Sequence, residues 1–172
     1  MYVNARKACG LSREEASYRL HIATRTLCNY EAGDSVPPPE VVLGMSRAYG
    51  QPAMTQQYCR RACAIGAAYS YEVLTNVNLD PPTVALKLLS ELGEAQAVLH
   101  RMLSVIVNKN DPGDFTAREW SQFSEDLHEF LDVEHNIETL KISLGRWTDM
   151  SVFVAQHNQK CRDRGYIKKE TA

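Results

Sequence analysis

Apolar residues recur along this chain at helical spacing, and no stretch alternates apolar and polar positions for long enough to predict a strand. The N-terminal part predicts short helices. Ser12 and Glu15 have the spacing of a capping box, in which the serine hydroxyl accepts from the first helical turn and the glutamate reaches back to the serine amide. Gly10 stands where it can end a preceding helix of about residues 4–9. We therefore expect one helix before Gly10 and another after Ser12.

Prolines mark the limits of the next helices. The run Val36-Pro-Pro-Pro-Glu40 breaks the chain and sets up a helix start, because the first turn does not need the amide hydrogen that proline lacks. That helix should extend to about Tyr49 and stop before Pro52. With a helix over about residues 23–32 and a short one over 53–59, the pattern predicts a compact five-helix head at residues 1–65.

After the head the character of the sequence changes. Residues 66–82 contain a polar, proline-rich run that is typical of a linker. Apolar residues then recur at alternating steps of three and four, which is a heptad seam and predicts one long helix. The seam consists of Ala85, Leu88, Leu92, Ala95, Leu99, Met102 and Ile106.

A second long helix is expected to begin near Thr116, which forms another capping box with Glu119. Its apolar positions keep nearly the same spacing, although Glu134 and Lys141 interrupt them. They are Trp120, Phe123, Leu127, Phe130, Ile137 and Leu144. Two such helices predict an antiparallel hairpin at residues 83–150, whose seam a second copy of the chain would cover most easily, as a dimerisation region. Residues 151–172 are interpreted as a solvated basic tail, and the predicted fold class is all-α.

Composition supports a folded protein that does not enter membranes. The chain has 172 residues, of which 44% are hydrophobic, and no stretch approaches the roughly 18 apolar residues of a membrane span. Five cysteines form no secreted framework, so we expect reduced thiols and a cytoplasmic location. The net charge of −2 is unevenly divided, with +3 on residues 1–70 and −5 on the remainder. A modestly basic head can approach phosphates, whereas the acidic body would be repelled by them.

The stretch from Leu11 to Gly33 can present one polar helix face. Its apolar positions, which can pack together and against the flanking helices, are Ala16, Leu20, Ile22, Leu27 and Tyr30. This packing leaves Thr24, Arg25, Cys28 and Asn29 on the outer face of the last helix. A helix that enters the DNA major groove requires such a presented face.

This stretch, LSREEASYRLHIATRTLCNYEAG, resembles without gaps the helix-turn-helix domain of the Cro and phage-repressor type, the XRE family. The resemblance extends over about residues 2–60 and implies a lambda-repressor-like head that binds double-stranded DNA. It implies that Arg13 contacts the phosphate backbone, that Thr24 and Arg25 meet base edges, and that Asn29 follows one turn later. An arginine at such a position can fork onto the two acceptors of a guanine. Further phosphate candidates are Arg6, Lys7 and Arg47, although all three can equally be solvated surface charges, and for Arg47 the solvated charge is favoured.

Three residues depart from the family pattern. His21 replaces the turn glycine, and a left-handed conformation costs a non-glycine residue roughly 1–2 kcal/mol. Ala23 replaces the usual capping serine, at about 1 kcal/mol, unless Thr24 takes over the cap one residue later. Ser17 replaces a packed alanine, and its hydroxyl can bond back to a carbonyl of its own helix.

Metal and catalytic sites have weaker support. The loop Asn108–Glu119 has the length and the glycine of a calcium loop, but Asn108 is neutral and Pro112 offers no ligand, so a proline-glycine turn followed by a helix cap is favoured. Cys59 and Cys63 share a helix face but lack the second ligand pair that zinc needs. No serine or cysteine has an evident base partner. We expect no cofactor, no metal and no enzymatic activity.

The sequence therefore predicts a DNA-binding transcriptional regulator, a repressor of phage or mobile-element type that acts as a homodimer on a palindromic operator. The alternative is a protein-interaction module, similar to an antitoxin or an adaptor, in which the helix-turn-helix has degenerated.

Overall fold

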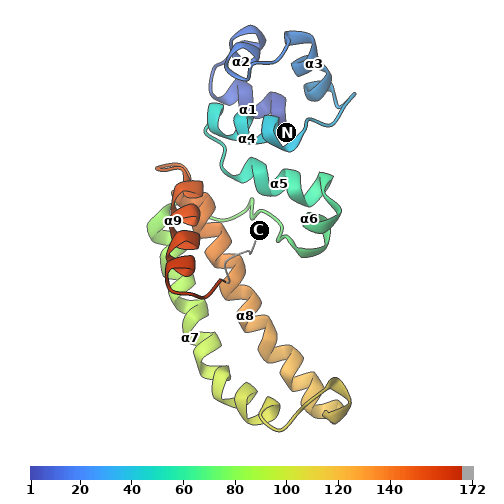
Figure 1. Cartoon of the computed structure of the whole chain (residues 1–172), viewed down its shortest axis with the longest axis vertical. Coiled ribbons are helices and arrows are strands. Elements are labelled where there is room, and N and C mark those ends of the chain that lie inside the picture. The colour runs from blue at the N-terminus through green and yellow to red at the C-terminus, as the bar shows by residue number, and fades with distance from the viewer. Residues whose placement is uncertain (168–172) are drawn as a thin grey trace. The chain divides into compact units, whose positions relative to one another are not determined.

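The structure, a computed structural model, describes residues 1–167 and is all-α within that range, as predicted (Figure 1). The chain forms two compact units. The first combines Met1–Val73 with the chain from Leu144 onward, and the second is Leu74–Ser143. None of the helices in the described part is long and apolar enough to cross a membrane.

The first unit begins with a bundle of short helices. They are α1 (Tyr2–Ala8), α2 (Arg13–Arg19), α3 (Thr24–Ala32), α4 (Pro39–Ala48), α5 (Ala53–Ala62) and α6 (Ala64–Tyr69). The first five correspond to the predicted helices, although α5 extends three residues past its expected end. Helix α6 lies mostly in the segment that we expected to be a linker. It packs tightly on α5, because a Cβ at Gly66 would lie 2.2 Å from the carbonyl oxygen of Cys59.

The core of this bundle gathers one apolar face from each of several helices. Ala16 from α2, Leu27 from α3 and Met45 from α4 are completely buried. Val42, Tyr49 and Met54 complete the buried cluster. Burying one such large side chain stabilises the fold by about 1.5–3 kcal/mol, so this cluster holds α2 and α3 in place.

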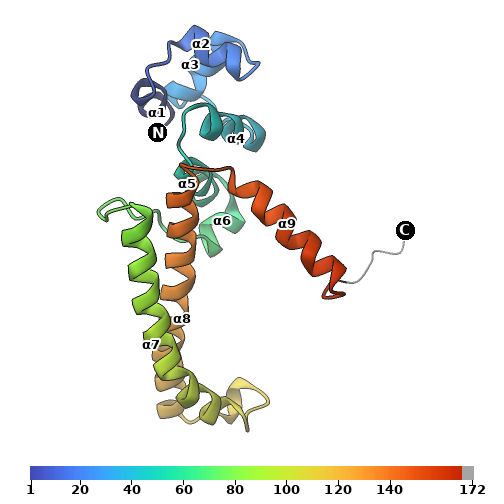
Figure 2. The same cartoon turned by 90° about the vertical axis from the view of Figure 1, so that its left-hand side faces the viewer.

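The second unit is a helical hairpin made of α7 (Pro81–Ile106), the short 3₁₀ helix η1 (Pro112–Asp114) and α8 (Ala117–Leu144). The two long helices run antiparallel, as predicted (Figure 2). At the hairpin tip, the ring of Phe115 meets Trp120 edge-on at 5.3 Å and Phe123 at 5.6 Å. Beside them the Lys109 ammonium lies 5.4 Å from the centre of the Phe115 ring. This aromatic cluster closes the end of the hairpin.

Most of the predicted heptad seam does not lie between the two helices. Ala95 and Met102 are buried, but Leu92, Leu99 and Ile106 are 47%, 40% and 36% exposed. The residues that α8 buries best are polar: Asp126, Thr139 and Ser143. Polar contacts hold this unit together, since Arg101 Nε donates to Asp126 Oδ2 at 2.9 Å and the Ser143 hydroxyl donates to the Leu79 carbonyl at 2.6 Å. Much of the predicted seam is thus left exposed by the hairpin, and the expectation that a second copy of the chain covers it stays a prediction.

The predicted basic tail contains a helix. Helix α9 spans Met150–Asp163, and the Asp149 side chain caps it by accepting from the Ser151 amide at 2.9 Å. Its last turn carries Lys160 and Arg162. Arg164 is its C-cap residue, and the last two basic residues of the predicted tail, Lys168 and Lys169, lie outside the described residues. The segment interpreted as a tail is thus helical as far as Asp163.

Candidate nucleic-acid interface

A tight turn joins α2 to α3. The capping box that starts α2 is present, with Glu15 N donating to Ser12 Oγ at 3.1 Å and Ser12 N donating to Glu15 Oε2 at 2.8 Å. At the other end of α2, His21 adopts a left-handed backbone with φ of 54°. Ile22 N then donates to the Ser17 carbonyl at 3.1 Å, which reverses the chain into α3. His21 therefore takes the conformation that the glycine of the family pattern would provide.

Helix α3 begins without a side-chain cap. Ala23 is its N-cap and Thr24 its first helical residue, so Thr24 does not replace the missing cap. Its hydroxyl lies 2.9 Å from that of Ser17, which itself donates to the Glu14 carbonyl at 2.9 Å. Because the single proton of Ser17 is used on that carbonyl, Thr24 donates to Ser17. The serine thus ties the start of α3 to α2, in addition to the predicted bond within its own helix.

The two sides of α3 differ sharply. Leu27 is completely buried in the core, whereas Arg25 is exposed and makes no hydrogen bond or ion pair with the rest of residues 1–167. Thr24, Cys28 and Asn29 are partly exposed. Gly33 ends the helix with φ of 87°, and its amide donates to the Asn29 carbonyl at 3.0 Å. The helix is therefore anchored at its back and both ends.

A buried carboxylate connects this helix to the start of α2. Glu31, whose side chain is 1% exposed, accepts from Arg6 Nε at 2.5 Å and from Arg13 Nε at 2.8 Å. Arg6 also donates through Nη1 to the Leu11 carbonyl at 2.7 Å. Arg13 remains 48% exposed, and its two Nη groups make no bond within the described residues. Glu31 thus holds Arg13 by one edge of its guanidinium and leaves the other edge available.

The electrostatics of this contact favour the charged forms. Burial raises the pKa of Glu31, but hydrogen bonds from Arg6 and Arg13 outweigh this effect and the pKa is lowered. The pKa of Arg13 is raised, first by the hydrogen bond to Glu31 and then by the nearby Cys28 thiol. Burial raises the pKa of Tyr49, which also faces Glu31, to about 12. The three charges at this contact therefore persist across the neutral pH range.

The further phosphate candidates lie in three different environments. Arg6 is buried against Glu31, so it is unavailable to a phosphate and that expectation is wrong. Arg47 donates to Asp149 Oδ2 at 3.0 Å and to Ser151 Oγ at 3.3 Å, and it is therefore engaged by the residues that start α9. Lys7 is exposed.

Sequence reasoning had not singled out Glu31 or the structural role of Arg6. The only signal was indirect, because Glu31 belongs to the Tyr-Glu-Ala-Gly exit that resembles the family pattern. Twenty-five positions separate the two residues. A contact over that separation depends on how α1 and α3 pack, which the spacing of residues does not encode.

Two predicted metal candidates have ordinary contacts. In the Asn108–Glu119 loop, Glu119 accepts from Thr116 N at 2.8 Å and from Lys109 Nζ at 3.0 Å. These bonds lower the pKa of Glu119 to about 2, with the Thr116 amide as the largest cause. Glu119 thus serves as a helix cap, as favoured from the sequence. Cys59 and Cys63 are both free and exposed.

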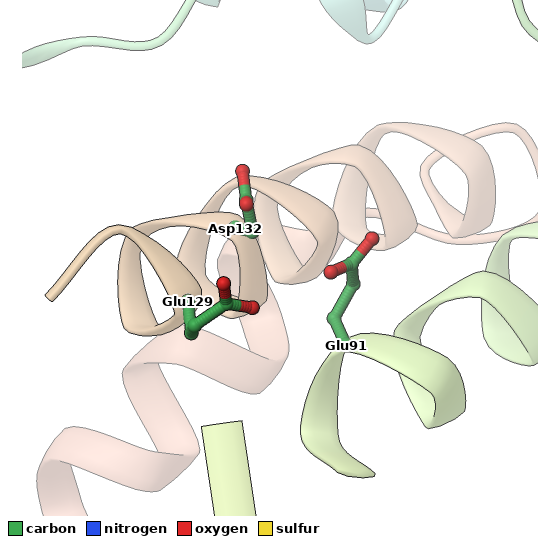
Figure 3. Close-up of side chains that lie close together, drawn as sticks. All are labelled: Glu91, Glu129 and Asp132. Carbon is green, nitrogen blue, oxygen red and sulfur yellow. The ribbon is translucent and has the colours of Figure 1, made fainter. Parts of the chain in front are cut away.

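A cluster of carboxylates lies between α7 and α8. Glu91 projects from α7, and Glu129 and Asp132 project from α8, with one oxygen from each lying within 4.8 Å of the others (Figure 3). Lys87 forms an ion pair with Glu91. The pKa of Lys87 is raised, first by its hydrogen bond to Glu91, and Asp132 contributes. The lysine is thus the cation that partly balances this cluster.

Comparison with protein families matches residues 4–55 to the family model of a helix-turn-helix domain. Comparisons with curated proteins and with solved structures find no match. The matched residues include α2, the His21 turn and α3, which are the elements that present Arg25 and Arg13. Residues 4–55 of this chain are therefore similar to a helix-turn-helix domain, and this match supports a DNA-binding domain there.

Proposed function

We propose that this protein is a sequence-specific transcriptional regulator, a repressor of the Cro or XRE type carried by phages and mobile elements, with α3 as its recognition helix. The main support for this proposal is the contrast between the two sides of α3. One side buries Leu27 completely, whereas the other exposes Arg25, which makes no hydrogen bond or ion pair within the described residues. A helix that is anchored on one side and polar on the other can enter the major groove as a rigid body. Neither a cofactor nor an enzymatic step is needed for this function.

Each residue of the presented face has a proposed role. Arg25 forks onto O6 and N7 of a guanine, which is the commonest specific contact between arginine and DNA. Asn29, one turn later, is suited to the N6 and N7 edge of an adenine. The Thr24 hydroxyl donates its hydrogen bond to Ser17, so Thr24 can offer a base only its methyl group or an acceptor lone pair. Cys28 lies between these readers and contributes a small, weakly polar contact.

Arg13 has a different task. Its free Nη groups are suited to a phosphate oxygen, and the bond from its Nε to Glu31 orients the guanidinium before DNA arrives. A phosphate contact fixes the register of the domain on the duplex but carries no base information. The head, with its net charge of +3 over residues 1–70, adds a general attraction to DNA that salt weakens.

We further propose that the cytoplasmic regulator acts as a homodimer on a palindromic operator. Two heads related by a two-fold axis meet two half-sites about one helical turn, or roughly 34 Å, apart. The proposed division of the chain is a head at residues 1–65, a linker at 66–82, a dimerisation hairpin at 83–150 and a C-terminal basic segment at 151–172.

The test begins with selection of bound fragments from genomic DNA, followed by titration of the selected site and a random duplex at several salt concentrations. Arg25→Ala should weaken binding to the selected site by about 1–3 kcal/mol and relax its specificity. Arg13→Ala should weaken both duplexes equally and reduce the salt dependence. Arg118→Ala, which removes one exposed charge from the hairpin, is the control and should change neither.

Equal and weak binding of the wild-type protein to every fragment would contradict the regulator proposal. It would favour the second candidate function, an interaction module similar to an antitoxin or an adaptor. The exposed leucines of α7 are the observation in favour of that alternative.

A further inference from the structure

The second unit carries large apolar side chains that neither of its helices covers. On α7 they are Leu89, Leu92, Leu99, Leu103 and Ile106. On α8 they are Trp120, Leu127, Leu131 and Ile137. We call these nine residues the apolar face; each is between 36% and 67% exposed.

On α7 the apolar face is a continuous stripe. The positions 85, 89, 92, 96, 99, 103 and 106 follow steps of four and three, and all except Gln96 are apolar. This is the heptad spacing of a helix that packs against another helix along its whole length. The charged residues of α7 lie on the other side of the helix by the same geometry: Lys87, Glu91, Glu94 and Arg101. The stripe therefore lacks charge, as the core of a protein interface does.

The apolar residues of α8 lie on the same side of the hairpin. On α7 the stripe residues Leu92 and Leu103 follow the buried Glu91 and Met102 by one position. The other exposed stripe residues Leu89, Leu99 and Ile106 each follow a partly buried residue in the same way. On α8 Leu127 follows the buried Asp126 in the same way. The helices α7 and α8 run antiparallel (Figure 2). For this reason, the residue that directly follows an inward-facing residue points to the same side of the helix pair on both helices. The hairpin is thus a two-helix layer with one apolar side.

The size of this face fits a stable interface. The exposed fractions of its nine residues add up to about four fully exposed large side chains. At about 200 Å² for each, this amounts to roughly 800 Å² of mostly apolar surface. A typical monomer exposes a largest apolar patch of about 300–600 Å², whereas a standard interface buries about 800 Å² on each partner.

We propose that the apolar face binds the same face of a second copy of this chain, so that two hairpins form a four-helix bundle. On α7 this face is apolar, uncharged and arranged in heptads, and such a face is complementary to itself, as a two-fold interface requires. On α8 Glu134 and Lys141 interrupt the apolar positions, so α7 contributes the continuous part of the interface. The polar contacts between α7 and α8 then lie within each hairpin, and the apolar residues lie between hairpins. Gln96 is the single polar residue of the stripe, and such a residue helps to set the register of packed helices at a cost in stability.

This inference rests on the proposed function only in assigning the dimer to operator binding; the surface itself is argued from the hairpin alone. The test therefore uses the full chain without DNA. Sedimentation equilibrium should give a mass about twice the 19.4 kDa of the chain at tens of micromolar. Leu103→Glu should raise the dimer dissociation constant by at least about 30-fold. Each copy of the chain then contributes one buried negative charge to the two-fold interface.

The chain offers a matched control. Leu86 is 69% exposed on the same helix but lies off the stripe, so Leu86→Glu should leave the dimer intact. Gln96→Leu should lower the dissociation constant of the dimer. A misfolded variant would not dimerise more tightly, so this result would report on the interface itself. A wild-type monomer, or equal dissociation constants for Leu103→Glu, Leu86→Glu and Gln96→Leu, would overturn the proposal.

A second arm separates this proposal from DNA binding. Leu103→Glu should still bind a single half-site with wild-type affinity while it loses the tighter binding to paired half-sites. A dimeric wild-type protein that binds all duplexes equally would refute the regulator function and leave the hairpin dimer standing. If the apolar face binds another protein instead of a second copy, the purified wild-type chain should sediment as a monomer.

Discussion

The contact between Glu31 and its two arginines gives the sharpest prediction for the stability of the head. Glu31→Gln keeps the size of the side chain and one acceptor but removes the negative charge. It leaves Arg6, whose side chain is 7% exposed, buried without a counter-ion. Removal of one partner of a buried pair costs about 3–5 kcal/mol. Because glutamine still accepts one bond, we expect about 3 kcal/mol, a large part of the roughly 5–15 kcal/mol that stabilises a domain.

Two comparisons separate the buried pair from the exposed one. Arg13→Ala removes a partner that is 48% exposed, so it should cost at most about 1 kcal/mol of stability. The double variant Arg6→Met with Glu31→Leu replaces the buried pair by apolar residues of similar size. It should recover most of the loss, because apolar replacement of a buried pair is often neutral.

The pH dependence of unfolding tests whether the negative charge of Glu31 stabilises the head. The pKa of Glu31 is lowered in the folded protein, so its contribution is present above the unfolded value and is lost as pH falls below about 4.5. Urea unfolding of wild type and Glu31→Gln should therefore differ by about 3 kcal/mol at neutral pH and by progressively less toward about pH 3. A difference below about 0.5 kcal/mol at neutral pH would refute the reasoning, as would a difference that does not shrink in acid.

Three further predictions concern local contacts. His21→Gly should stabilise the head by about 0.5–1 kcal/mol in thermal unfolding, because glycine adopts the left-handed turn without strain; a lower melting temperature would contradict this. Ala23→Ser should add a cap to α3 worth about 1 kcal/mol, since the backbone there is already extended, and an unchanged melting temperature would show that no cap forms. In an NMR titration, Glu119 should ionise with a midpoint near pH 2, and Lys109→Met should raise it; an unshifted midpoint in the variant would exclude the ion pair as a cause.

Local sequence determined much of the head. The Ser12 and Glu15 capping box, the prolines before α4 and the exit at Gly33 act over three or four residues, so their spacing was enough to predict where helices begin and end. The face of α3 followed from the apolar positions at Leu27 and Tyr30. The spacing predicted where this face lies, and the structure shows Leu27 buried beneath it.

Tertiary packing decided what periodicity left ambiguous. Helix α7 has apolar residues on two adjoining sides, and the predicted seam took members from both, such as the exposed Leu92 and the buried Ala95. The hairpin buries only the side of Val84 and Ala95. The choice depends on α8, whose buried side is polar and pairs Asp126 with Arg101. Similarly, Arg6 is one more basic residue in the sequence until α1 and α3 pack and bring Glu31 to it. Spacing along one helix determines which residues share a side, but only the partner helix determines which side is turned inward.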